Sequence, residues 1–156
     1  MQSAPDDRLA SYGQTVVEIL RPGKGSVRIR SAPHIDESAW PWPTGEPVHV
    51  LTAWDPGLER PGLARNRSRQ AALEADLGLL AVRLCAAVGI DPITGRREEG
   101  VAVFGASESE VLALGARYGQ DAVFAWTPGA WAIVGCGDGR RLVSGWSLCP
   151  PWSQEL

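Results

Sequence analysis

The order of hydrophobic patterns between Val48 and Thr127 restricts the fold more than any other feature of this sequence. Strand-like stretches occur at 48–54 (VHVLTAW), 83–90 (RLCAAVGI), 100–106 (GVAVFGA) and 121–127 (DAVFAWT). Helical patterns separate them at 63–82 and from Ser107, where Glu110 completes a capping box, to Gly119. The resulting order, β-α-β-β-α-β, is typical of a ferredoxin-like antiparallel sheet covered by two helices. The sequence therefore predicts an α+β fold.

The flanking segments have weaker patterns. Residues 7–20 carry apolar side chains at helical spacing and predict a short helix, although Gly13 and Thr15-Val16-Val17 weaken it. Residues 26–31 alternate as a strand does, and apolar runs at 130–135 and 141–146 around a Gly-rich turn predict a C-terminal hairpin. We expect a single domain over 1–156, with an N-terminal extension at 1–47, the α+β core at 48–146 and a coil tail at 147–156.

A long loop, residues 32–47, precedes the core and contains four prolines and two tryptophans. Tryptophan often buries its ring while its N–H stays in contact with water, so Trp40 and Trp42 can fold back as a plug over the core. Long loops in compact domains are often functional, so the same residues can form a lid or a partner-binding segment. The sequence leaves both interpretations open.

Charge and cysteine content narrow the classes of function. A formal net charge of −3 argues against the broad electrostatic attraction that nucleic-acid binding usually needs. No apolar run is long enough to span a membrane, and the N-terminal stretch has no signal-peptide pattern. The three cysteines form no CxxC pair, which suits reduced thiols. We expect a cytoplasmic protein without metal or other cofactor, since His34, near Asp36 and Glu37, lacks further clustered ligands.

The helix at 63–82 loses its apolar stripe towards its N-terminal end. The stripe consists of leucines at helical spacing: Leu73, Leu77, Leu80 and Leu84. On a helical wheel Asn66 and Arg69, and less closely Gln70, fall on the same face. Because burying an unpaired polar group is costly, these side chains need partners. They can bind the backbone of the 55–62 loop, or they can face a cleft between the helix start and the Trp40/Trp42 loop.

Such a cleft would suit an anion. A helix N-terminus offers free N–H groups and the positive end of the helix dipole, and arginine offers a planar fork for phosphate or carboxylate. Arg65, Asn66 and Arg69 lie in the first turns, beside the Asp55-Pro56-Gly57 turn. The helix start is itself open: Pro61 or Ala64 can mark it, or Asn66 can be its N-cap.

Several of these residues belong to a longer pattern. T-A-W-D-P-G is followed by N-R and Q-A-x-L-E-x-x-L, then by E-x-x-V-x-V-F-G and Y-G-Q-D-A-V-F. Over about residues 48–134 this pattern resembles a family of small bacterial proteins known only as a domain of unknown function. The resemblance implies a site at Asp55-Pro56, Asn66, Glu98 or Glu99, and 119–124, and implies no reaction. The chain departs from the family pattern at Asp55, where asparagine is expected, and at Arg96-Arg97, where an aromatic residue and proline are expected.

Gln120 follows the helix stop at Gly119 and precedes a buried strand. Its amide can tie the helix end to the sheet, or it can line the same cleft as Asn66. If both helices run in the same direction, Gln120 lies at the opposite end of the fold from Asn66. This reasoning favours the structural tie.

Three functions follow from these patterns as hypotheses. The leading one is a non-catalytic domain that binds a small anionic ligand or an acidic partner peptide through Arg65, Asn66 and Arg69, beside Asp55 and the Trp40/Trp42 loop. The second is an enzyme without a cofactor that uses the same cleft, with proton transfer by Asp55, His49 or Glu99. The third is a single-stranded nucleic-acid-binding module using arginines and tryptophans, which the net charge disfavours.

Overall fold

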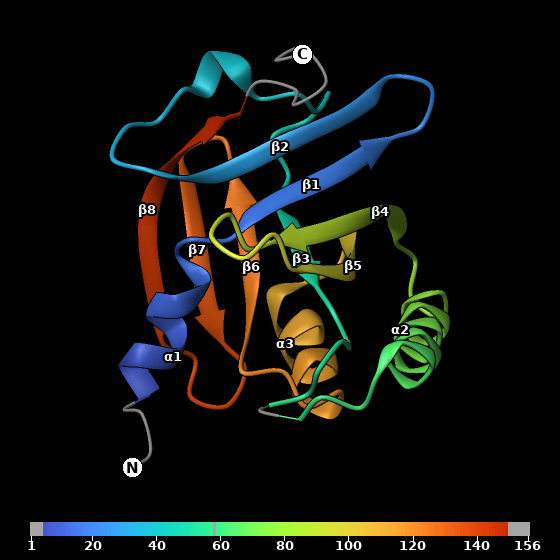
Figure 1. Cartoon of the computed structure of the whole chain (residues 1–156). Coiled ribbons are helices and arrows are strands. Elements are labelled where there is room, and N and C mark those ends of the chain that lie inside the picture. The colour runs from blue at the N-terminus through green and yellow to red at the C-terminus, as the bar shows by residue number, and fades with distance from the viewer. Residues whose placement is uncertain (1–4, 58, 150–156) are drawn as a thin grey trace.

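Strands with an apolar inner face close on themselves to form an antiparallel barrel (Figure 1). The computed structural model describes residues 5–57 and 59–149. Within these residues eight strands are neighbours in the order β1-β2-β8-β7-β6-β3-β5-β4. They are β1 Val16–Arg21, β2 Gly25–Ala32, β3 Val48–Leu51, β4 Arg83–Ile90, β5 Arg97–Phe104, β6 Ala122–Thr127, β7 Ala130–Gly135 and β8 Arg141–Leu148. The α-helices are α1 Pro5–Tyr12, α2 Leu63–Leu77 and α3 Glu108–Arg117.

The predicted ferredoxin-like α+β fold is wrong. From β3 to β6 the order of elements along the chain is the expected one, but the sheet that they form is not open. β1 pairs with β4 and β2 pairs with β8, so the segment predicted as an N-terminal extension supplies two strands that join the sheet edges. Closure removes the exposed edges that an open sheet would leave.

The helix predicted at 7–20 is wrong in its second half. α1 ends at Tyr12, and Val16 begins strand β1. Val17 and Ile19 point into the barrel and are fully buried, whereas Leu20 points outwards and is half exposed. β-branched side chains favour a pleated surface over a helix, so the period-two alternation prevails over the weaker helical spacing.

Other predicted elements are close to the observed ones. Strand β2 is confirmed, β7 and β8 form the expected hairpin, and α3 begins with the Ser107–Glu110 capping box. Helix α2 ends at Leu77, earlier than the predicted residue 82, and β5 begins at Arg97, earlier than the predicted residue 100. From residue 150 onwards, the predicted coil tail lies outside the described residues.

Two apolar layers hold the fold together. One fills the barrel interior and includes Ile29, Val48 and Phe124. The other lies between the barrel wall and helices α2 and α3, and includes Leu73, Val103 and Val111. Strands β3, β6 and β7 and the second half of β5 are therefore buried on both faces, which explains why they read as nearly continuous apolar runs.

Aromatic rings fill one end of the barrel. Trp40 packs edge-to-face on Trp126 with centroids 4.7 Å apart, and Trp42 packs on Phe104 at 4.8 Å. The 32–47 loop thus places its two indoles against the core, and Trp146 completes the cluster at 5.1 Å from Trp126. In Figure 1 this cyan loop lies at the top, and the green segment that leads from β3 to α2 lies at the bottom.

Candidate functional site

At the other end of the barrel, β3 leaves the sheet and side chains from α2 take over its hydrogen bonds. Gln70 Oε1 accepts the Ala53 N–H at 2.9 Å, and Asn66 Oδ1 accepts the Asp55 N–H at 2.9 Å. Both α2 side chains are buried. A buried backbone N–H requires a partner, and here the polar residues in the helix stripe supply it.

The backbone carbonyls of the same segment are satisfied in a similar way. Arg69 Nε donates to Ala53 O at 3.0 Å, and its guanidinium also donates to Tyr118 O. Gln120 Nε2 donates to Trp54 O at 3.0 Å. The polar residues that interrupt the leucine stripe of α2 therefore form hydrogen bonds with residues 53–55 and with the end of α3.

Gln120 lies at the same end of the barrel as Asn66, so its expected position at the opposite end is wrong. The reason is the antiparallel pairing of β3 and β6, in which Val50 is opposite Phe124. This pairing brings the end of β3 next to the start of β6, and Gln120 directly precedes β6. Gly57 N–H also donates to Gly119 O at 2.9 Å, which joins the two connections.

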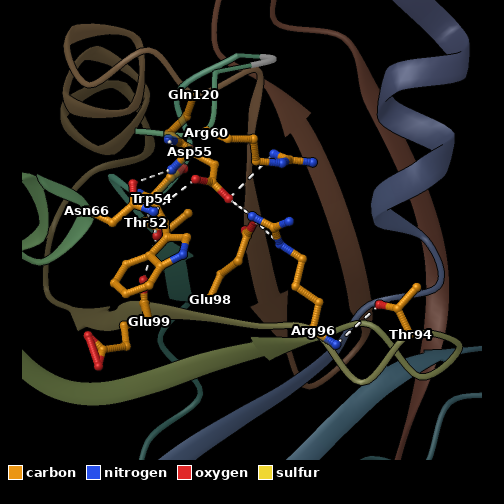
Figure 2. Close-up of polar contacts among 10 residues, drawn as sticks. All are labelled: Thr52, Trp54, Asp55, Arg60, Asn66, Thr94, Arg96, Glu98, Glu99 and Gln120. Carbon is orange, nitrogen blue, oxygen red and sulfur yellow. Dashed lines mark hydrogen bonds and ion pairs between the residues drawn. The ribbon is translucent and has the colours of Figure 1, made fainter. Parts of the chain in front are cut away.

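Asp55 is the centre of this end of the molecule (Figure 2). Its backbone has φ 42°, a left-handed conformation that Asp and Asn adopt more readily than most residues. Its carboxylate is almost completely buried, and Asn66 Nδ2 donates to Oδ1 at 2.8 Å. The other oxygen, Oδ2, accepts a hydrogen bond from the Arg96 guanidinium and lies 3.4 Å from Arg60 Nη1.

Arg96 reaches Asp55 from an ordered turn between β4 and β5. Asp91 Oδ1 accepts the Ile93 N–H at 2.9 Å, and Thr94 Oγ1 accepts the Arg96 N–H at 3.2 Å. The resemblance implied asparagine at position 55 and an aromatic residue and proline at 96–97. In the structure Asp55 and Arg96 form an ion pair with each other.

The paired groups line a cavity of about 340 Å³. Its wall includes Asp55, Arg60, Arg96, Glu98, Trp54 and Gln120. Burial raises the pKa of the Glu98 carboxyl, and the nearby Arg96 and Arg60 oppose this effect. Arg96 Nε lies 3.8 Å from Glu98 Oε1, beyond hydrogen-bond distance. The cavity therefore combines two guanidinium groups with the fully engaged Asp55 and the loosely engaged Glu98, and two further carboxylates, Asp91 and Asp121, also line its wall.

Glu98, and not Glu99, belongs to this cavity. Glu98 points to the barrel axis together with Ala102 and Phe104, whereas Glu99 turns to the outer side, where Arg67 lies 3.4 Å away (Figure 2). Side chains alternate along a strand, so two adjacent glutamates must face opposite ways. The spacing from Ala102 and Phe104 was the signal in the sequence that distinguishes them.

The structure separates several residues that the sequence had placed together. Asn66 and Arg69 lie behind the 53–55 segment rather than on the cavity wall, and Arg65 is exposed and does not line the cavity. Trp40 and Trp42 pack at the other end of the barrel. Sequence reasoning gave no binding role to Arg60 and treated Arg96 only as a departure. Their role depends on the tertiary contact with Asp55.

His49 lines a different groove, on the outer wall of the barrel, with Glu108 and Arg141. It is buried, and its Nε2 lies 4.0 Å from Glu108 Oε1. Burial lowers the pKa of the His49 imidazole, while Glu108 raises it and Arg141 lowers it further. The structure thus does not bring together Asp55, His49 and Glu99 as one proton-transfer group.

Fold and site define a class: a closed antiparallel barrel with a charged cavity at one end. Residues 51–123 match the model of a family described as protein of unknown function (DUF3293), which confirms the resemblance to a domain of unknown function. This stretch contains all the charged residues of the cavity that contact Asp55. The comparisons with curated proteins and with solved structures gave no match. No helix in the described part of the chain has the length and apolar character to cross a membrane.

Proposed function

We propose that the protein binds a small molecule and that the cavity beside Asp55 receives an anionic group of this ligand. The observation that carries the proposal is that two guanidinium groups share one oxygen of a single buried carboxylate. Each guanidinium has five N–H donors, and one carboxylate oxygen satisfies few of them. A ligand carboxylate or phosphate would supply the missing acceptors.

Arg60 is the better placed of the two arginines for this role. Its side chain is 60% exposed, and its contact with Asp55 is an ion pair at 3.4 Å. It has no hydrogen-bond partner among residues 5–57 and 59–149. Arg60 can therefore turn to a ligand while Arg96 continues to neutralise Asp55. Charge-assisted contacts between arginine and an anion are among the stronger polar contacts in proteins.

The shape of the site favours a small molecule over an acidic peptide. A concave cavity of about 340 Å³ is within the range that small ligands occupy. Arg60 and Arg96 would contact the anion, in place of the residues predicted from the sequence, Arg65, Asn66 and Arg69. Asn66 and Arg69 would instead position the 53–55 segment. A cytoplasmic location is part of the proposal and is supported by the three free cysteines.

The proposal is tested by thermal denaturation with increasing phosphate or acetate at constant ionic strength. We expect a saturable rise in the melting temperature, because a ligand that binds only the folded state stabilises it. Arg60→Gln should abolish the rise. Arg67→Gln is the matched control, since Arg67 is 59% exposed and also lies 3.4 Å from a carboxylate, but outside the cavity. No shift with either anion, or equal loss in both variants, would reject the proposal.

A further inference from the structure

A smaller recess in the barrel interior adjoins the charged cavity. The recess has a volume of about 60 Å³ and is lined mainly by apolar side chains, including Val17, Val50 and Phe124. Both spaces share Tyr12, Thr15, Gly89 and Glu98 in their walls. The recess and the charged cavity are therefore adjacent, with these four residues at their junction.

The recess has space beside Gly89, an inward-facing position without a side chain. Gly89 is opposite Val17 on β1 and opposite Glu98 on β5, so it faces the same interior as these residues. Gly100 follows Glu98 on the same face of β5 and also lines the recess. At the other end of the barrel, the corresponding space is filled by the indoles of Trp126, Trp131 and Trp146.

The size and lining of the recess select the chemistry of its occupant. A group the size of a water molecule needs about 15 Å³ of cavity volume. The recess of about 60 Å³ therefore holds about four non-hydrogen atoms. A polar group placed against Val17, Val50 and Phe124 would lose its hydrogen bonds to water, whereas an apolar group would gain by leaving water.

We infer that the ligand is an amphiphilic acid, with its anionic group at Arg60 and Arg96 and an apolar chain or ring edge of about four carbon atoms in the recess. This inference rests on the proposed function, because it assigns the other half of the same ligand. Glu98 lies at the junction of the two spaces, where its carboxyl oxygens are available to a polar hydrogen of the ligand.

The inference is tested with a series of straight-chain acids: acetate, butanoate, hexanoate and octanoate. Each is titrated into the full chain, and dissociation constants are measured from amide chemical shifts. Each buried methylene group should strengthen binding about fourfold. The gain should stop when the recess is full, at about four carbons beyond the carboxylate.

A variant that fills the recess distinguishes it from the charged cavity. In Ala122→Val the two added carbons occupy part of the recess, because Ala122 lines the recess but not the charged cavity. This variant should bind acetate as the original chain does but should gain less affinity from longer chains. Ala86→Val, on the outward face of β4, is the control and should retain the full dependence on chain length.

The outcomes separate the two proposals. Equal affinity for all four acids in the original chain would overturn the inference and leave the proposed function intact. Persistence of the full chain-length dependence in Ala122→Val would also overturn it. If neither acetate nor phosphate binds, the proposed function fails and the inference fails with it.

Discussion

At the scale of single residues, Asn66 and Asp55 form a reciprocal pair. Asn66 Oδ1 accepts the Asp55 N–H, and Asn66 Nδ2 donates to Asp55 Oδ1. One amide thus fixes both the backbone and the carboxylate of a residue in a left-handed conformation. The ion pairs with Arg60 and Arg96 depend on this geometry, so Asn66 is a positioning residue for the cavity.

Replacing Asn66 with alanine should lower the free energy of unfolding by about 1–3 kcal/mol, because it leaves a buried N–H and a buried carboxylate oxygen without that partner. Urea denaturation measures the loss. Ser68→Ala, two positions along the exposed face of α2, should change stability by less than about 0.5 kcal/mol. A loss in Asn66→Ala no larger than in this control would show that the pair contributes nothing measurable.

His49 should make the fold sensitive to mild acid. Burial holds the pKa of its imidazole below the usual range, so the unfolded chain binds a proton more readily than the folded chain. The contribution of the neutral His49 imidazole to the stability of the folded state is therefore fully present above the unfolded pKa of about 6.5. It is lost as the pH falls below that value. Glu108 and Arg141 face the imidazole and contribute to the same balance.

We expect the stability difference between His49→Gln and the original chain to shift in favour of the variant as the pH decreases from 7 to 5. Urea denaturation at several pH values measures this difference, which cancels the titration of groups common to both proteins. A difference that stays constant over this range would mean that His49 does not carry the acid sensitivity.

At the scale of elements, the sequence predicted most strands and the two long helices because each pattern depends on neighbours within a few residues. The capping box at Ser107 is an example, since its two hydrogen bonds join residues three apart. The helix predicted over 7–20 was wrong at Val16–Arg21 because its pattern, too, was assessed only from neighbouring residues. Its apolar residues fit both periods, and only the barrel, by burying Val17 and Ile19 on one side, decides between them.

Closure of the barrel could not be predicted in this way. It depends on the pairing of β1 with β4 and of β2 with β8, between segments that are far apart in the chain. A periodic pattern identifies a strand but not its partners. The position of Gln120 also depends on strand pairing, because the antiparallel pairing of β3 and β6 places the start of β6 beside the end of β3.

The ligand-binding role predicted for Asp55 and Asn66 stays a prediction. The sequence did indicate that Asn66 is a polar residue on a buried face that needs a partner, and in the structure that partner is Asp55. Arg60 and Arg96 were missed because arginines are common in this chain and only the fold brings these two to one carboxylate.

At the scale of the whole molecule, the two ends of the barrel are built differently. Tryptophans close one end, while the other end, which includes Gly89 and several charged residues, is hollow. A hollow end contributes less apolar burial than a filled one, so the protein gives up stability where it gains a cavity. Gly89 and Gly100 allow this trade-off to be examined, since both are interior strand positions without a side chain.

Gly89→Ala should raise the free energy of unfolding by about 0.5–1 kcal/mol, because alanine restricts the unfolded chain and the new Cβ meets only ordinary contacts. Gly100→Ala should lower it by about 1–3 kcal/mol, because its Cβ would lie 2.9 Å from Leu51 O and force β3 to move. Urea denaturation of both variants decides the point. If both substitutions change the free energy of unfolding in the same direction, Gly89 does not border unfilled space. Opposite signs would show that Gly89 maintains the hollow end at a cost to stability, whereas Gly100 is required by close packing.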